Sequence, residues 1–258
     1  MKKKLILVTN DDGIFAPGLK ALVSVAKKHG KVIIIAPNSP QSGMGHAITI
    51  NKPLRIHKVD VFKDVEAYEC SGTPVDCVKL AKNVVLKNQK IDLCLSGINH
   101  GSNASINILY SGTMSAAMEA AIEGTPSIGF SLSDFSFNAD FSAGSSFISS
   151  IIKNILKHGI PNSNLLNVNI PKLPKSKIKG IKICRQAEGS WVEEFKEAID
   201  PRNEKYYWLT GKFANNDPGK DTDLYALDRG YISIVPSGHD LTAYKSIEAL
   251  HFLENIKK

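Results

Sequence analysis

Short, continuously apolar runs alternate with helical patterns along the first two thirds of the chain. Residues 5–9 and 31–37 are two such runs. The segment between them has apolar residues at the i, i+3, i+4, i+7 spacing of one helix face: Leu19, Leu22, Val23 and Ala26. Strands that are apolar at every position and joined by helices are typical of a parallel sheet covered on both faces. The pattern predicts an α/β fold with a Rossmann-like, doubly wound and mostly parallel sheet flanked by helices.

The alternation continues to residue 171. We expect strands at 91–96, 126–131 and 165–171, and helices at 73–85, 112–124 and 140–158. Alternating apolar and polar positions over residues 47–70 predict a β-hairpin insertion. Beyond Pro171, an aromatic and turn-rich stretch at 206–223, a strand at 230–236 and a helix from residue 246 are expected.

The last third of the chain has too little apolar content for a core of its own. We therefore expect one domain over residues 1–258, with a core at about 1–171 and a C-terminal oligomerisation extension at about 172–258. Several apolar residues of this extension need a partner surface: Tyr206, Tyr207, Trp208, Phe213, Leu250 and Phe252. They predict at least a homodimer.

The charge balance favours an anionic partner, because 32 Lys and Arg against 25 Asp and Glu give a net charge of +7. The basic residues are scattered, so a phosphate compound is expected and a nucleic acid is not. No apolar run approaches the roughly 20 residues of a membrane helix, and no signal-peptide pattern is found. The four cysteines form no CxxC pair. We expect reduced, buried thiols in a cytoplasmic protein without membrane contact.

Two adjacent carboxylates, Asp11 and Asp12, follow the first predicted strand and precede Gly13. In open α/β sheets, ligands bind beyond the carboxyl ends of the strands. Two carboxylates held close together repel each other, and a hard divalent cation such as Mg²⁺, Mn²⁺ or Ca²⁺ removes that conflict. In the alternative interpretation, one Asp caps the following helix and the other is solvated. The sequence leaves both possibilities open.

Polar loops follow two more strands at the same edge of the predicted sheet, and their Ser and Asn oxygens could complete a cation shell without adding charge: Asn38, Ser39, Ser42, Ser96, Asn99 and Asn103. Ser111, Gly112 and Thr113 precede a predicted helix, where backbone N–H groups and the helix dipole favour a phosphate. The same residues could simply cap the helix. His100 could be a proton donor, but we expect it to be a solvent-facing turn residue. Asp76 is expected to be the third residue of its helix. Neither a P-loop nor a GxGxxG motif is present.

Several motifs occur in a fixed order: TNDDGIFAPG, QSGMGHAIT, GTPVDCV, LSGINHGSN, YSGTMSAAMEA, LNVNIP and TDLYALDRGYISIVP. Together they resemble the stationary-phase survival protein SurE family of metal-dependent 5′/3′-nucleotidases. The resemblance implies hydrolysis of nucleoside 5′- and 3′-monophosphates, some activity toward short polyphosphate, and one Mg²⁺ or Mn²⁺ per subunit. It implies that the metal ligands are Asp11, Asp12, Ser42 and Asn99. It also implies cytoplasmic homodimers or homotetramers, formed in part through an exchanged C-terminal segment.

These observations lead to the hypothesis of phosphomonoester hydrolysis by activated water. Asp11 and Asp12 are the candidate catalytic residues, since either could accept the proton of water. The candidate phosphate-binding residues are Asn103, Ser111, Gly112 and Thr113. Two alternatives stay open. Asp11 could be the nucleophile of an aspartyl-phosphate phosphatase, although the usual DxD spacing is absent. The protein could also be a non-enzymatic sensor that binds nucleotide and metal.

Overall fold

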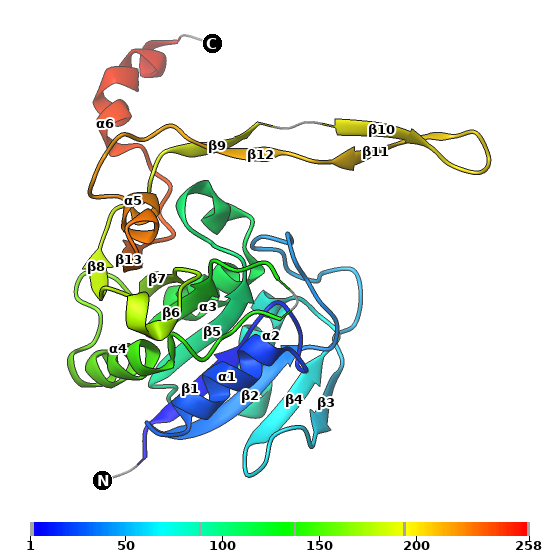
Figure 1. Ribbon diagram of the computed structural model, residues 1–258, viewed down its shortest axis with the longest axis vertical. Coiled ribbons are helices and arrows are strands. Elements are labelled where there is room, and N and C mark those ends of the chain that lie inside the picture. Colours follow the sequence, from blue (N-terminus) through cyan, green and yellow to red (C-terminus); the bar gives the residue numbers. More distant parts are fainter. Residues whose placement is uncertain (1–2, 88, 137, 193–194, 257–258) are drawn as a thin grey trace.

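A nine-stranded, mostly parallel sheet forms the centre of the computed structural model, which describes residues 3–87, 89–136, 138–192 and 195–256 (Figure 1). The strand order is β3-β4-β2-β1-β5-β6-β7-β13-β8. These strands are β1 (Leu5–Thr9), β2 (Lys31–Pro37), β3 (Ile56–Val59), β4 (Glu66–Cys70), β5 (Leu93–His100), β6 (Ser127–Leu132), β7 (Leu165–Ile170), β8 (Ile181–Ile183) and β13 (Ile232–Ser237). The chain builds the sheet outward from β1 through β2 and returns to its other side at β5. The boundary between β1 and β5 is therefore the topological switch point, where such sheets bind ligands.

Helices cover both faces of this sheet: α1 (Pro17–Ala26), α2 (Pro74–Leu80), α3 (Gly112–Ile122) and α4 (Ser145–His158). The short elements are α5 (Asp223–Asp228), α6 (Tyr244–Ile247), a π-helical turn at Ala81–Val85, and 3₁₀ turns at Ser105–Leu109, Lys175–Lys177 and Glu248–Asn255. Ile6 and Val8 of β1 belong to one hydrophobic cluster with residues of α1 and α4. The alternate residues Leu5 and Leu7 belong to a second cluster with residues of α2 and α3. The predicted fold class is confirmed, and the alternation explains why the strand is apolar at every position.

The expected hairpin within residues 47–70 is present but shorter, because only β3 and β4 pair antiparallel. The hairpin is also part of the main sheet and not only an insertion, because its second strand, β4, pairs parallel with β2. The C-terminal part likewise contributes β13, which pairs antiparallel with β7 and parallel with β8. The four cysteines are free and buried, as predicted.

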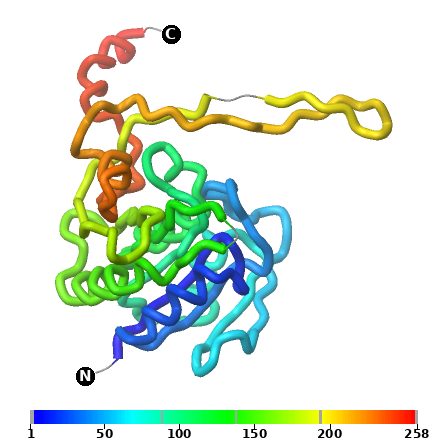
Figure 2. The backbone as a smooth tube through the Cα atoms, in the orientation of Figure 1, coloured from blue at the N-terminus to red at the C-terminus, as the bar shows by residue number. Residues whose placement is uncertain are grey.

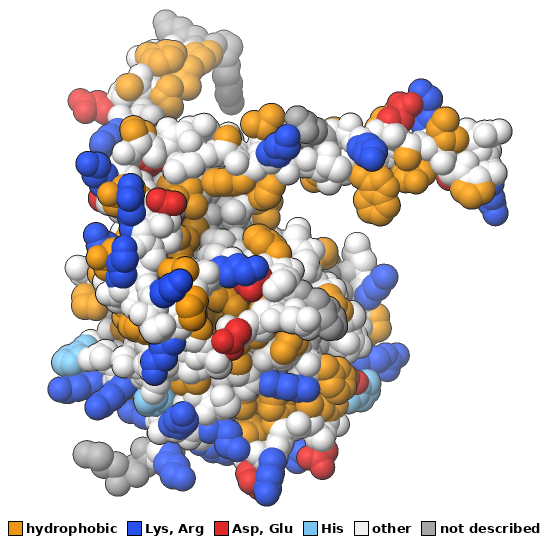
Figure 3. Space-filling model, viewed as in Figure 1, with side chains coloured by type: hydrophobic (Ala, Val, Ile, Leu, Met, Phe, Trp, Pro, Cys, Tyr) orange, Lys and Arg blue, Asp and Glu red, His pale blue; other side chains and the backbone are white. Residues whose placement is uncertain are grey.

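A long hairpin arm projects from the body of the molecule (Figures 1 and 2). It consists of β9 (Gly189–Val192), β10 (Phe195–Ile199), β11 (Lys205–Leu209) and β12 (Lys212–Asn215), in which β9 pairs with β12 and β10 with β11. Hydrophobic side chains lie on the surface of the arm and of the projecting C-terminal segment (Figure 3). Trp208 on the arm is 62% exposed and Phe252 near the C-terminus is 64% exposed. Among the described helices, none combines the length and the apolar character that crossing a membrane requires.

Candidate active site

The candidate residues from four separate parts of the sequence line one cavity of about 580 Å³ beyond the carboxyl ends of β1 and β5. Its polar lining includes five of the predicted site residues: Asp11, Ser42, Asn99, Asn103 and Ser111. The other part of the lining is apolar and comes from Tyr110, Phe135, Trp191 and Leu209. The cavity thus joins an oxygen-rich end to an aromatic end.

Asp11 brings a buried carboxylate to the lining of the cavity, with 3% of its surface exposed. Burial raises its pKa to about 6, and the charge of Asp12 adds to that effect. The hydroxyl of Thr113 opposes it by donating a hydrogen bond to Asp11 Oδ1. Thr113 is itself fully buried and does not line the cavity. The Thr113 hydroxyl therefore contacts the Asp11 carboxylate and orients it, and it does not face the cavity.

Gly112 lets α3 approach this carboxylate closely. A β-carbon at Gly112 would lie 2.7 Å from Asp11 Cβ and 3.1 Å from Asp11 Oδ2. The preceding residue, Ser111, caps the helix by accepting a hydrogen bond from the Met114 N–H at 3.0 Å. Ser111 also lines the cavity, so its capping role and a position beside a ligand are compatible.

Asp12 lies beside His100 rather than among the residues that line the cavity. Its Oδ2 is 3.4 Å from the His100 backbone nitrogen and 3.7 Å from His100 Nδ1. The His100 ring contacts Phe141 edge-on, with the ring centroids 4.7 Å apart. The expectation of a solvent-facing His100 is wrong, because the ring is half-buried and lines the cavity. Neither aspartate caps α1, because the N-cap residue of this helix is Ala16, which makes no side-chain cap hydrogen bond.

Asn99 reaches the cavity because β5 has an irregularity between Ser96 and Asn99. Such bulges re-aim side chains at the ends of strands. The Asn99 amide nitrogen donates to the carbonyls of His100 and Gly101 at 3.0 and 2.9 Å. No hydrogen bond to Asn99 Oδ1 is found within the described part of the chain, which leaves this oxygen available to a ligand.

Asn103 is fixed by a buried network of polar side chains. Its amide nitrogen donates to Ser131 at 2.7 Å, and its backbone N–H donates to Asn169 Oδ1 at 2.8 Å. Asn167 donates to the Asn103 carbonyl at 2.8 Å. Because these bonds set the Asn103 loop against β6 and β7, the loop is a rigid part of the cavity wall.

The donor set fits a hard divalent cation. Asp11, Ser42 and Asn99 present only oxygen ligands to one cavity, with the carboxylate of Asp12 next to them. A dication would relieve the unfavourable burial of Asp11 and its repulsion with Asp12, and oxygen ligands suit Mg²⁺ or Mn²⁺. No group of three or more His, Cys, Asp or Glu able to hold a metal occurs among the described residues. A cation here therefore depends on the neutral oxygens of Ser42 and Asn99.

The aromatic wall is the part of the site that the sequence did not reveal. Trp191 from the arm is held by its indole N–H, which donates to Asn107 at 2.7 Å. It also packs edge-on against Phe213, with ring centroids 5.6 Å apart. Tyr110 directly precedes Ser111 and Phe135 follows β6, so both are far from Trp191 in the sequence. No local pattern connects these residues, so only the fold could identify them.

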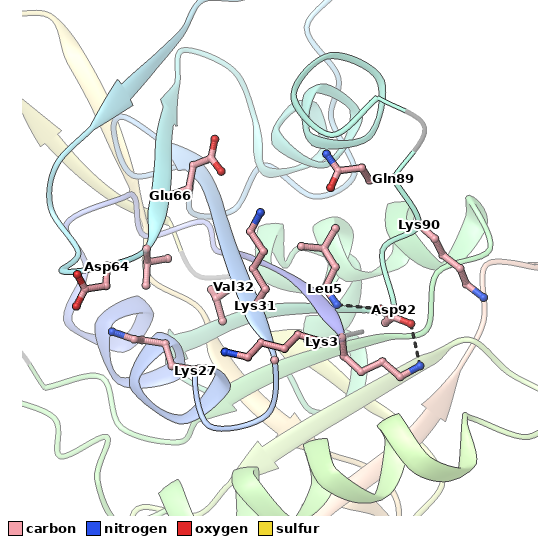
Figure 4. Close-up of a pocket in the computed structure, with 13 residues that line it drawn as sticks. Lys3, Leu5, Lys27, Lys31, Val32, Asp64, Glu66, Gln89, Lys90 and Asp92 are labelled. Atoms are coloured by element: carbon pink, nitrogen blue, oxygen red, sulfur yellow. Dashed lines mark hydrogen bonds and ion pairs between the residues drawn. The ribbon is translucent and has the colours of Figure 1, made fainter. Parts of the chain in front are cut away.

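A larger cavity of about 810 Å³ contains none of the predicted site residues (Figure 4). It lies at the amino ends of β1 and β2, opposite the candidate site. Five lysines and three acidic residues line it, and one pair, Lys4 and Asp92, forms a salt bridge at 3.0 Å. Because lysines and acidic residues are mixed in its lining, this cavity lacks a cluster of oxygen ligands like the one around Asp11.

Comparison with known proteins points to one family. A family model described as Survival protein SurE matches residues 6–193. A protein of Christiangramia forsetii named 5′-nucleotidase SurE is 60% identical over 252 residues, which cover 96% of each chain. A protein of the same name from Flavobacterium psychrophilum is 57% identical over 97% of this chain and 98% of its own. The crystal structure of the SurE protein from Aquifex aeolicus matches with a TM-score of 0.84 and 40% identity, over 97% of this chain and 100% of that chain.

Proposed function

This chain belongs to the Survival protein SurE family, and on that premise we propose that it is a 5′-nucleotidase that requires a divalent cation. The substrates are nucleoside 5′-monophosphates, and the products are nucleoside and phosphate. The proposal extends to 3′-monophosphates and short polyphosphate, and to a cytoplasmic homodimer or homotetramer, which the motif resemblance implies. One observation supports it above all: a single cavity joins the oxygen-rich end at Asp11 to an aromatic end at Trp191.

Asp11, Asp12, Ser42 and Asn99 are the residues that would hold one Mg²⁺ or Mn²⁺ per subunit. When bound, such an ion polarises phosphoryl oxygens and makes water a better nucleophile at neutral pH. Asp11 or Asp12 would accept the proton of the attacking water. The buried Thr113 hydroxyl keeps the Asp11 carboxylate in one orientation.

The remaining candidate residues would bind the two ends of the substrate. Ser111 lies at the N-terminus of α3, where the helix dipole and free backbone N–H groups favour a phosphoryl group. Asn103 is held in the adjoining wall by Ser131 and Asn169. Gly112 would contribute through the space that it leaves for Asp11. The apolar surface of Tyr110, Phe135 and Trp191 would cover the nucleoside, since aromatic side chains bind planar bases.

Two alternatives make different predictions. An aspartyl-phosphate phosphatase would form a covalent bond between Asp11 and phosphorus, and rapid quenching with labelled substrate would trap label on the protein. Direct attack by water leaves the protein unlabelled. A single turnover in ¹⁸O-water places the heavy oxygen in phosphate by either route, so the label trapped on the protein decides between them. We expect unlabelled protein and labelled phosphate. A sensor would bind metal and nucleotide without releasing phosphate.

The function is tested by phosphate release from a panel of nucleoside 5′- and 3′-monophosphates. We expect release that stops with a chelator and returns when excess Mn²⁺ or Mg²⁺ is added. A chain that releases no phosphate from any phosphomonoester, with either metal, would refute the proposal.

A further inference from the structure

The loop that carries Ser42, defined here as residues 38–50, contains no regular secondary structure. Gly43 and Gly45 have positive φ angles of 74° and 55°, a conformation that glycine adopts without steric cost. Two backbone hydrogen bonds connect the loop to the site: Gln41 N–H donates to the Asp11 carbonyl at 2.8 Å, and Gly45 N–H donates to the Tyr110 carbonyl at 3.2 Å. Ser42 itself is exposed. Its position therefore depends on anchors elsewhere in the loop.

One anchor is the first turn of α2. The Thr73 hydroxyl donates to the Ala47 carbonyl at 2.7 Å, and Thr49 N–H donates to Asp76 Oδ1 at 3.2 Å. Thr73 and Asp76 also form the capping box of α2, so this helix end is rigid. These contacts hold the far end of the loop, five to seven residues from Ser42.

The nearer side-chain anchor is His46, four residues from Ser42. His46 Nε2 is 2.9 Å from Glu119 Oε2, and Lys79 Nζ is 2.5 Å from Glu119 Oε1. The Glu119 side chain is 6% exposed, whereas that of His46 is 33% exposed. Burial alone would raise the pKa of the Glu119 carboxyl, but the hydrogen bonds from Lys79 and His46 outweigh it and lower the pKa. An ionised, buried carboxylate is a strong acceptor for a loop side chain.

Glu119 belongs to α3, the helix whose first turn contacts Asp11 through Thr113. The same helix therefore supports two parts of the oxygen-rich end of the cavity. It contacts Asp11 directly, and it holds the Ser42 loop through His46. We propose that His46 is a positioning residue, which holds the loop against Glu119 and so keeps Ser42 beside Asp11. The part of this inference that concerns the cation rests on the proposed function; the part that concerns the loop does not.

Hydrogen–deuterium exchange of the metal-free full-length protein tests the loop directly. In His46→Ala, amides of residues 41–46 should exchange about tenfold faster, because a charge-assisted hydrogen bond is lost. Glu119→Gln should give a smaller increase in the same peptide. His46→Gln keeps a side-chain N–H donor and should restore most of the protection. His57→Ala is the matched control, since His57 is a surface histidine that also faces a glutamate, Glu69, at 3.7 Å. Unchanged exchange at 41–46 in both His46→Ala and Glu119→Gln would overturn the inference.

Metal affinity and kinetics test the consequence for the site. His46→Ala should bind Mn²⁺ about tenfold more weakly and raise KM, with kcat within about twofold at saturating Mn²⁺ and substrate. His46→Gln should recover the affinity. A merely structural role would lower the active fraction, and hence kcat, without changing Mn²⁺ affinity, and that result would overturn the positioning role. If the wild-type protein hydrolyses no nucleotide while the loop still loosens in His46→Ala, the proposed function fails and the anchoring role of His46 stands.

Discussion

Replacing Gly112 by alanine should disable the site through Asp11. An added β-carbon would lie 2.7 Å from Asp11 Cβ and 3.1 Å from its Oδ2. Carbon atoms do not approach each other this closely, so either the carboxylate or the first turn of α3 must shift. Thr113, the next residue of that turn, holds the Asp11 carboxylate and would move with it. The substitution therefore tests whether the position of Asp11 determines activity.

The effect on stability is smaller than the effect on function. Overpacking of this kind costs about 1–3 kcal/mol, whereas replacing a helical glycine by alanine stabilises by at most about 1 kcal/mol. With the full gain of about 1 kcal/mol, the net loss is about 0–2 kcal/mol, which lowers the Tm by up to about 8 °C, at about 2–4 °C per kcal/mol for a chain of this size. Displacing a reacting group by about 1 Å can reduce the rate about 100-fold. We therefore expect kcat/KM to fall about 10- to 100-fold in a protein that stays folded.

The assay compares Gly112→Ala with Gly238→Ala, since no atom lies within 4 Å of a β-carbon added at Gly238. Phosphate release gives kcat/KM, calorimetry gives Mn²⁺ affinity, and thermal unfolding gives the Tm. Gly238→Ala should match the wild type in all three. If Gly112→Ala bound Mn²⁺ and turned over substrate as the wild type does, the close packing of α3 on Asp11 would have no functional role, and the reasoning would be refuted.

Asp11, the α2 cap and the exposed apolar surface of the C-terminal part each give a further testable expectation. In metal-free protein, the pKa of Asp11 is about 6, whereas its ordinary value is 3.8. The folded state therefore binds the Asp11 proton more tightly than the unfolded state does. This proton stabilises the fold below about pH 4, and the stabilisation is lost as the pH rises to about 6. Asp11→Asn in chelator should therefore be more stable than the wild type at pH 7.5, by up to about 3 kcal/mol in urea unfolding, and a difference that does not grow between pH 4 and 7.5 would contradict this. Thr73→Ala should lower the free energy of unfolding by about 1–2 kcal/mol, because it removes the α2 capping box and the bond to Ala47, while Thr73→Ser should not. Light scattering at micromolar concentration should show at least a dimer, and Trp208→Ser combined with Phe252→Ser should reduce the mass; a monomeric wild type would disprove the predicted assembly.

The sequence pattern predicted the parallel core well because the strands are apolar on both faces. In β1, Ile6 and Val8 pack into the hydrophobic cluster on one face of the sheet, and Leu5 and Leu7 pack into the cluster on the other face. Because both faces are buried, the strand is apolar at every position. The pattern was less informative where a strand has one exposed face. β4 was expected only as part of a hairpin, and its pairing with β2 depends on an edge of the sheet that local periodicity does not reveal.

The polar end of the site was predictable because Asp11 follows a strand, Asn99 lies at the end of one and Ser111 caps a helix. The sheet topology brings such positions together. His100 was misassigned as a solvent-facing turn residue because its half-buried position depends on Phe141, which lies in a different loop. His46 lies in the motif QSGMGHAIT, yet its role depends on Glu119, 73 residues away. Trp191 reaches the cavity only because the arm begins beside Asn107. Contacts between distant segments leave no periodic signal, and these residues were therefore missed.

The central claim is that the buried carboxylate at the end of β1 holds a cation together with the neutral oxygens beside it. Calorimetric titration of the metal-stripped protein with Mn²⁺ tests this most directly, with Asp11→Asn titrated in parallel. We predict one ion bound per chain in the wild type and no detectable binding in the variant at the same concentrations, with both proteins folded. Mn²⁺ binding of equal affinity in Asp11→Asn, or no binding to the wild type, would contradict the account.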